Sequence, residues 1–215
     1  RVIAAAPNRK GEYASTLGST KVQVKVNGDW MPAVPLLSYK TQVNALLPFG
    51  LTGPTIELQV ENDGVQSVPI VVNVREATPG IFTTDASGIG QAAVLNYDQQ
   101  GVYTSTNSTQ RPVKVGGYIS VYATGCGDLT PRPTMNSIVD ANTVIPSTAA
   151  PVAVSFDKEL TVVADWAGSV PGMVSGLCQI NVKVPPIVNP RSKVPINLEI
   201  NGHKSAPETF VSISN

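Results

Sequence analysis

Apolar residues recur at every second position in many short runs of this chain, and this alternation constrains its fold more than any other feature. The runs lie at Val22/Val24/Val26, Ile56/Leu58/Val60, Val68/Ile70/Val72/Val74, Ile119/Val121/Ala123, Val152/Val154/Phe156, Ile180/Val182/Val184 and Ile196/Leu198/Ile200. A period of two is that of a β-strand with one buried face. The dipeptides Asn27-Gly28, Asp63-Gly64 and Asn201-Gly202 tolerate positive φ and predict tight hairpins between such strands.

Glycine and proline, 18 of each, interrupt nearly every gap between the runs and leave few places for a long helix. Many short strands separated by turns are typical of a sandwich and not of βαβ units. The sequence therefore predicts an all-β protein with almost no helix. Its cores are expected to contain Val24, Val43, Leu58, Val72, Val121, Val154, Ile180 and Leu198.

An internal repeat divides the chain into two copies of one domain. Gln42–Pro48 matches Gln179–Pro185, and Ser67-Val68-Pro69 matches Ser205-Ala206-Pro207 after an equivalent hairpin. Self-similarity of this kind is the signature of a duplicated unit. We predict two tandem immunoglobulin-like β-sandwich domains.

The predicted domains span residues 1–76 and 77–215, joined by the short stretch that ends at Gly80. The second domain has an extra N-terminal β segment, residues 81–112, with no counterpart in the first. We therefore expect the first domain to leave a sheet edge or an apolar groove uncovered. Unpaired backbone groups on such an edge recruit strands from other chains.

Charge and composition favour a secreted protein without a nucleic-acid or anionic-membrane partner. Lys plus Arg and Asp plus Glu are 15 each, and 14% of residues are charged, so the chain lacks the basic field that such partners require. No apolar run is long enough to span a bilayer. The first residue is Arg1 and not Met, as after removal of a signal peptide, although a trimmed sequence looks the same. We expect an extracellular or cell-surface protein.

Several motifs resemble those of a bacterial family. The matching stretches, in the family's order, are Val24–Gly28, Gln42–Gly50, Ala77–Phe82, Gly90–Asn96, Tyr122–Gly125 and Gln179–Pro185. They resemble the Solibacter-type C-terminal domain of secreted bacterial proteins, whose halves are similar to IPT/TIG immunoglobulin-like domains. The resemblance implies tandem immunoglobulin-like domains outside the cell, and it carries no catalytic residues.

The two cysteines, Cys126 and Cys178, pair in an oxidising compartment or stay as two buried thiols. Cys126 stands where the family has an apolar residue after Thr-Gly, and Cys178 stands where it has an aromatic residue before the Gln-Ile-Asn strand. Two such replacements in one domain imply a disulfide.

The sequence shows no clear motif for catalysis, cofactor binding or metal binding. The one histidine, His203, directly follows the Asn201-Gly202 turn. This position predicts a solvated hairpin tip and not a member of a catalytic triad. Gly88–Ala93 fits a dinucleotide-binding pattern but runs into a strand where that motif needs a helix. Asn62-Asp63-Gly64 lacks the further carboxylates of a calcium loop. We expect no catalytic residue, no cofactor and no metal, and hence no enzyme.

Asn107-Ser108-Thr109 forms a glycosylation sequon inside a run of hydroxyl residues. The run predicts an exposed loop, so Asn107 is a candidate for a glycan. Tripeptides of this kind also occur by chance.

Two functions fit these features. The first is a subunit of a surface filament that self-associates head to tail through strand addition. The inserting segment would be Arg1, Val2, Ile3, Ala4, Ala5 and Ala6, which is terminal and apolar. The alternative for that segment is an ordinary first strand of its own domain, matching Tyr118–Thr124.

The second function is a carbohydrate- or cell-surface-binding module of a larger secreted protein. Aromatic residues that stack on sugar rings would carry it, and Trp30, Tyr39 and Trp166 are the candidates. Packing in a core or between domains is the alternative use of these three side chains. Aromatics make up only 6% of the chain, which favours the filament.

Overall fold

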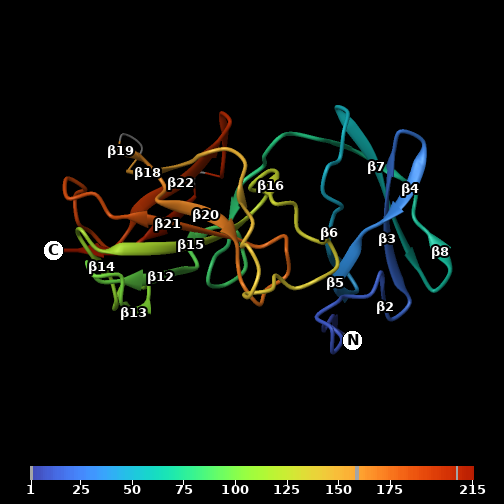
Figure 1. The fold of residues 1–215 in the computed structure, drawn as a ribbon, viewed down its shortest axis with the longest axis horizontal. Helices are drawn as coiled ribbons and strands as arrows, with labels where there is room; N and C mark the ends of the chain where they lie inside the picture. Colours follow the sequence, from blue (N-terminus) through green and yellow to red (C-terminus); the bar gives the residue numbers. More distant parts are fainter. Residues whose placement is uncertain (1, 158–159, 207) are drawn as a thin grey trace. The chain divides into compact units, whose positions relative to one another are not determined.

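A computed structural model describes residues 2–157, 160–206 and 208–215. The described residues form strands, turns and irregular segments with no helix, which confirms the all-β prediction (Figure 1). In those residues there is accordingly no helix that could cross a membrane. The chain divides into two compact units. The N-terminal unit comprises residues 1–75, 132–143 and 171–176, and the C-terminal unit comprises the remainder.

The C-terminal unit contains most of the strands. They are β10 (Gly80–Ile81), β11 (Gly90–Gln91), β12 (Val94–Tyr97), β13 (Tyr103–Thr106), β14 (Val113–Lys114), β15 (Tyr118–Thr124), β16 (Leu129–Thr130), β17 (Ser147–Thr148), β18 (Val152–Phe156), β19 (Leu160–Val163), β20 (Trp166–Ser169), β21 (Cys178–Lys183), β22 (Val194–Ile200), β23 (His203–Lys204), β24 (Thr209–Val211) and β25 (Ile213–Ser214).

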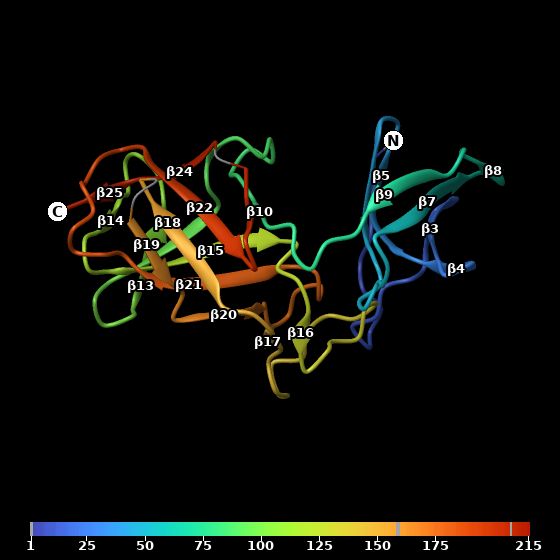
Figure 2. The same cartoon turned by 90° about the horizontal axis from the view of Figure 1, so that it is seen from above.

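Two large sheets of this unit lie face to face (Figures 1 and 2). One has the order β13-β12-β15-β21-β20-β17-β16, and the other has the order β11-β24-β22-β18-β19. Inward side chains of both sheets join in one buried cluster that includes Val121, Val154, Ile180 and Leu198. These four were predicted core residues, and each is 0% exposed. Alternation along each strand therefore produces one core between two layers.

The N-terminal unit contains the remaining strands. They are β1 (Ile3–Ala4), β2 (Thr16–Leu17), β3 (Thr20–Val26), β4 (Asp29–Pro32), β5 (Val34–Tyr39), β6 (Gln42–Leu46), β7 (Thr55–Asn62), β8 (Val65–Gln66) and β9 (Ile70–Asn73). One sheet has the order β1-β5-β6; in the other, β3 and β7 are central, with β2 and β4 beside β3 and with β8 and β9 beside β7. A hydrogen bond of 2.8 Å between the hydroxyls of Thr20 and Ser38 links the two sheets.

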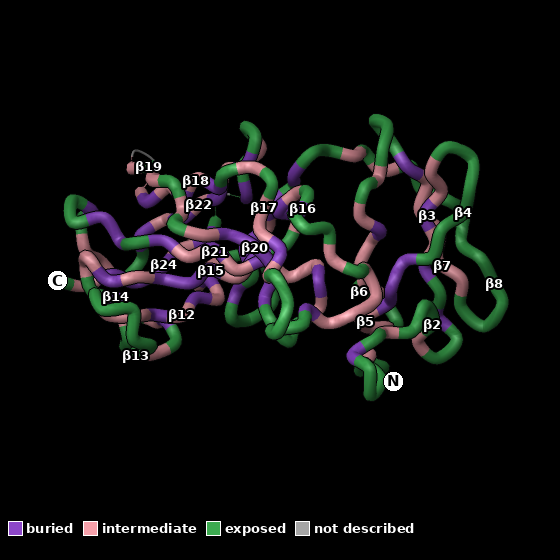
Figure 3. Tube along the Cα trace, viewed as in Figure 1, coloured by how far each residue is buried: buried purple, intermediate pink, exposed green. Residues whose placement is uncertain are grey.

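The core of the N-terminal unit is smaller than predicted. Val24 is 0% exposed, but the other predicted core residues here, Val43, Leu58 and Val72, are only partly buried. The small sheet has three strands in the described chain, one of them two residues long, so it covers less of the larger sheet. Figure 3 shows β4 and β8 largely exposed, whereas β15, β21 and β22 are buried or partly buried at nearly every position.

The three predicted hairpins are confirmed. Asn27-Gly28, Asp63-Gly64 and Asn201-Gly202 connect β3 to β4, β7 to β8 and β22 to β23. Asn27, Asp63 and Asn201 have φ of 52°, 51° and 49°, and each following glycine also has positive φ. Two consecutive positive φ values match the right-handed twist of the flanking strands.

The repeat is visible in the backbone. Ser67 N–H donates to Val60 O at 2.8 Å, while the Ser67 hydroxyl accepts from Val60 N–H at 3.1 Å. Ser205 makes the same pair of contacts to Leu198, at 2.8 and 3.0 Å. β7 with β9 is therefore the counterpart of β22 with β24.

Two segments distant in sequence complete the N-terminal unit. In residues 132–143, Ile138 N–H donates to Gly11 O at 2.8 Å, and Asn136 O accepts from Tyr13 N–H at 2.6 Å. Residues 171–176 pair with the first segment through the bridge between Val174 and Ile138. The N-terminal unit is thus built from three stretches of chain, two of them beyond residue 76.

Candidate assembly edge

β9 lies at an edge of the large sheet of the N-terminal unit. It pairs antiparallel with β7 from Thr55↔Asn73 to Leu58↔Ile70, and it has no second strand partner in the described chain. Val74 N–H donates to Pro54 O at 2.9 Å. Hydrogen-bonded pairs alternate along an antiparallel ladder, so the backbone groups of Val71 and Asn73 point away from β7. They are available to another strand.

Large apolar side chains gather along this edge. Val65, Val68, Ile70 and Val71 are 73%, 83%, 57% and 70% exposed. β9 itself carries no charge and no proline, which are the usual devices against edge-to-edge pairing. The edge strand β13 of the C-terminal unit, by contrast, has the polar sequence Tyr-Thr-Ser-Thr. The β9 edge is apolar where an isolated soluble domain is normally polar.

The counterpart strand in the C-terminal unit is covered. β24 pairs with β22 and, on its other side, runs parallel to β11. Gly90 N–H donates to Glu208 O at 2.8 Å, and Ala92 N–H donates to Phe210 O at 2.9 Å. β11 belongs to the extra segment, residues 81–112, that the first repeat lacks. One repeat therefore supplies its own covering strand, and the other leaves the same edge free.

A shallow depression of ≈ 390 Å³ adjoins β9 on the outer face of the sheet. Its lining includes Val71, Lys25 and Glu57. The Lys25 ammonium lies 3.3 Å from the Glu57 carboxylate and 5.7 Å from the centre of the Trp30 ring. Lys25 and Glu57 neutralise each other, so the surface beside the edge has little net charge.

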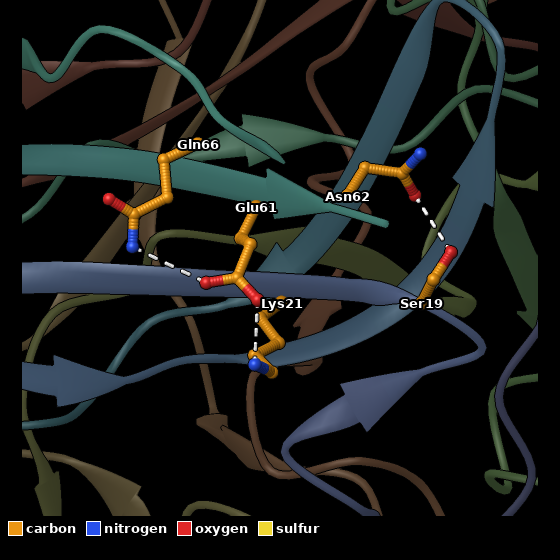
Figure 4. Close-up of polar contacts among 5 residues, drawn as sticks. All are labelled: Ser19, Lys21, Glu61, Asn62 and Gln66. Atoms are coloured by element: carbon orange, nitrogen blue, oxygen red, sulfur yellow. Dashed lines mark hydrogen bonds and ion pairs between the residues drawn. The ribbon is translucent and has the colours of Figure 1, made fainter. Parts of the chain in front are cut away.

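A polar network holds β8 at the start of the same edge (Figure 4). The Glu61 carboxylate accepts hydrogen bonds from Lys21 Nζ at 2.7 Å and from Gln66 Nε2 at 3.3 Å. The Lys21 contact and then the Gln66 contact lower the pKa of Glu61 below its ordinary 4.5. Because the folded-state pKa is lowered, this contribution to stability is present above the unfolded pKa and is lost as the pH falls through the folded value.

Replacing Lys21 by Met should raise the pKa of Glu61 back towards 4.5, since it removes the larger of the two contacts. A pH titration of the side-chain carboxyl carbons by NMR measures this. Lys25→Met, on the same strand but paired with Glu57, is the control and should leave Glu61 unchanged. An identical Glu61 midpoint in Lys21→Met would contradict the assigned cause.

The predicted inserting segment forms a strand in its own unit, except for Arg1, which lies outside the described residues. Ile3 and Ala4 form β1 and pair with Ser38 and Leu37 of β5, and Ala5 N–H donates to Leu36 O at 2.9 Å. Val2 and Ile3 remain 55% and 39% exposed. The segment is not the counterpart of Tyr118–Thr124. That strand, β15, pairs with β21, which corresponds to β6 in the repeat, whereas β1 pairs with β5.

Cys126 and Cys178 form a disulfide, with their Cα atoms 6.5 Å apart. Both are buried in the core of the C-terminal unit. Cys178 is the first residue of β21 and pairs in register with Ala123 of β15, so the bridge joins β21 to the segment that directly follows β15. The sequence separation of 52 residues encloses both segments that complete the N-terminal unit.

Asn107 does not lie in an exposed loop, and that prediction is wrong. It is 1% exposed. Its Nδ2 donates to Asn96 Oδ1 at 2.8 Å and to Ser212 O at 2.9 Å. Its Oδ1 accepts from Ser212 N–H at 2.8 Å and from Gln91 Nε2 at 3.0 Å. Neighbouring Thr109 is exposed, but the folded chain leaves Asn107 Nδ2 no room for a glycan.

The other residues singled out from sequence lie on different strands. Trp30 and Tyr39 are 39% and 45% exposed, on β4 and at the end of β5. Trp166 is partly buried on β20. His203 is on the β23 hairpin strand, and the Gly88–Ala93 segment forms β11 with no helix after it. Within the described residues, no three potential metal ligands come together.

No protein-family model matches this chain, and no curated protein sequence matches it.

Proposed function

We propose that this protein is an extracellular structural subunit of two tandem immunoglobulin-like sandwiches, akin to the Solibacter-type family, that assembles head to tail into a surface filament. The observation that carries the proposal is the free β9 edge, whose counterpart β24 is covered by β11. An apolar edge that one repeat covers and the other leaves open is a site for strand addition. No catalytic role belongs to this function.

The occupant of the β9 edge is the segment of residues 1–6 of a second copy. Residues 2–6 of the segment are uncharged, as β9 is, and their apolar side chains suit the exposed side chains of Ile70 on one face of the edge and Val71 on the other. The segment is held in its own unit by two residue pairs and one further backbone hydrogen bond. Few interactions are therefore lost when the segment leaves β5 of its own copy and pairs with β9 of a neighbouring copy.

Donor segment and acceptor edge are different surfaces, so the contact is heterologous. Contacts of this kind propagate into a fibre unless the rotation between copies closes a ring. A buried disulfide is compatible with the oxidising space outside the cell. Both features agree with a surface filament.

Val71→Lys tests the proposal. The side chain is 70% exposed, so a lysine there changes the stability of a single copy little but places a charge on the acceptor edge. We expect fibres of the unchanged protein by negative-stain microscopy, and folded single copies of Val71→Lys by microscopy and sedimentation. Val163→Lys is the matched control, because Val163 is 67% exposed on the edge strand β19, and it should still form fibres.

Removal of residues 1–6 tests the donor separately. The shortened chain should stay folded and fail to assemble. Its own β9 edge is unchanged, so it should still cap the fibre end at which residues 1–6 of the last copy are free. Three results contradict the proposal: fibres that form equally well with Val71→Lys, fibres that form without residues 1–6, or closed dimers made by pairing of two β9 edges.

A further inference from the structure

One face of the C-terminal unit carries most of the tyrosines of the chain. Ile119, Val121 and Ala123 of β15 belong to the core, so Tyr118 and Tyr122 on the same strand point to the opposite, outer face. Register places further side chains on that face: Tyr97 lies opposite Tyr118 and Tyr103, and Trp166 lies opposite Asn181. Four of the six tyrosines and one of the two tryptophans thus share one side of the sheet.

Several of these aromatic side chains have defined contacts on this face. The Tyr103 ring meets the Tyr97 ring edge to face, with the centres 5.9 Å apart. The Lys183 ammonium lies 5.6 Å from the centre of the Tyr118 ring. Burial, with a smaller contribution from Tyr97, raises the pKa of the Tyr122 phenol, so that group stays a neutral hydrogen-bonding hydroxyl.

A depression of ≈ 430 Å³ lies on this face, within the range of about 300–1,000 Å³ usual for small-ligand sites. Its lining side chains are uncharged and include Tyr97, Tyr118, Gln99 and Gln100 from one side and Gln179 and Asn181 from the other. Flat aromatic surface and amide groups therefore meet in one hollow.

The amides of the hollow are held in place by a buried hydroxyl. Ser120 is 3% exposed, and its hydroxyl donates to Asn181 Oδ1 at 2.7 Å. Gln179 Nε2 donates to the same oxygen at 2.8 Å. Asn181 Nδ2 and Gln179 Oε1 have no partner among the described residues, so an oriented donor and an oriented acceptor face the hollow.

This combination suits a sugar better than other ligands. The C–H face of a pyranose ring packs on an aromatic ring, while its hydroxyls, each both donor and acceptor, match amide groups. An apolar ligand would leave the amides unpaired in the contact, which is costly. The lining itself holds no charged side chain for an anionic ligand; the ammonium of Lys183 lies beside the lining residue Tyr118 and contacts its ring.

We propose that the hollow between Tyr97, Tyr118, Gln179 and Asn181 binds a neutral oligosaccharide, with the two tyrosines as stacking platforms and the two amides as hydroxyl partners. The site lies within the C-terminal unit and does not depend on the filament. It would attach the protein to a polysaccharide of a cell wall or matrix.

Fluorescence of Trp166, the register neighbour of Asn181, reports on the site. A Trp30→Phe background leaves Trp166 as the only tryptophan. The probes are cellohexaose, xylohexaose and mannohexaose, with polygalacturonate as the acidic comparison. We expect at least one neutral probe to change the emission saturably with a Kd at or below roughly 1 mM.

Variants assign the binding to this hollow. Tyr97→Ala should weaken binding about tenfold through loss of stacking, while Tyr97→Phe, which keeps the ring, should stay within about threefold. Gln179→Ala, a second variant, should also weaken binding, and Tyr39→Ala, an exposed tyrosine of the N-terminal unit, should not. Thermal unfolding of each variant confirms that it is folded.

Three outcomes overturn the assignment. Binding of polygalacturonate alone would make the ligand acidic. Unchanged affinity in folded Tyr97→Ala and Gln179→Ala would move the site elsewhere. If none of the neutral probes binds saturably, the hollow is not a sugar site, and the tyrosine face would instead contact a protein partner.

Discussion

Asn107→Ala should lower the free energy of unfolding by about 3 kcal/mol or more, because it leaves several buried polar groups without a hydrogen-bond partner at once. The Asn107 amide bonds Asn96 Oδ1, both backbone groups of Ser212 and the Gln91 side chain. It therefore ties the segment after β13 to the last strands of the chain, which are far away in sequence. Water does not replace these contacts at a side chain that is 1% exposed.

Chemical denaturation followed by tryptophan fluorescence measures the change. Thr109→Ala is the matched control: it destroys the same sequon at an exposed position and leaves the Asn107 amide intact, so its stability should be within about 0.5 kcal/mol of the unchanged protein. Equal stability of Asn107→Ala and Thr109→Ala would show that the buried network contributes little.

Loss of the disulfide should destabilise the C-terminal unit by about 3 to 4 kcal/mol in the loop-entropy model. The bridge closes a loop with a sequence separation of 52 residues, and it is buried beside the core strands β15 and β21. Without it, the unfolded chain gains the freedom of that whole loop. Folding must then close it with non-covalent contacts alone.

Denaturation with and without a reducing agent tests this effect. The Cys126→Ser/Cys178→Ser double variant should resemble the reduced protein, and a reducing agent should not change it further. Its midpoint should therefore be the same under both conditions. Full stability of the reduced protein would contradict the prediction, as would modification of free thiols in native protein by an alkylating reagent.

The candidate assembly edge was partly predictable. The extra segment at residues 81–112 has no match in the first repeat, which by itself indicates an uncovered surface. Sequence does not say which surface, because β11 covers β24 through backbone hydrogen bonds that leave no pattern in the residues. The location at β9 follows only when the two repeats are compared as folded sheets.

The tyrosine face and the buried asparagine were not predictable. Tyr97, Tyr103, Tyr118 and Tyr122 lie on three strands, and only the register of those strands brings them to one side. The aromatic residues predicted from sequence to contact a sugar were Trp30, Tyr39 and Trp166, and among these Trp166 alone lies on this face. Asn107 looked like a loop residue since hydroxyl residues surround it, yet its partners come from the far end of the sequence.

The sequence by itself determined the strands and the hairpins. These depend on local physics: alternation selects a half-buried strand, and Asn-Gly or Asp-Gly adopts the positive φ values that a tight hairpin requires. Only the tertiary structure decided which edge is covered, how deeply Leu58 or Asn107 is buried, and which tyrosines share a face. Burial and pairing depend on what lies opposite a residue, and the residues opposite belong to segments whose position follows from the packing of the whole unit.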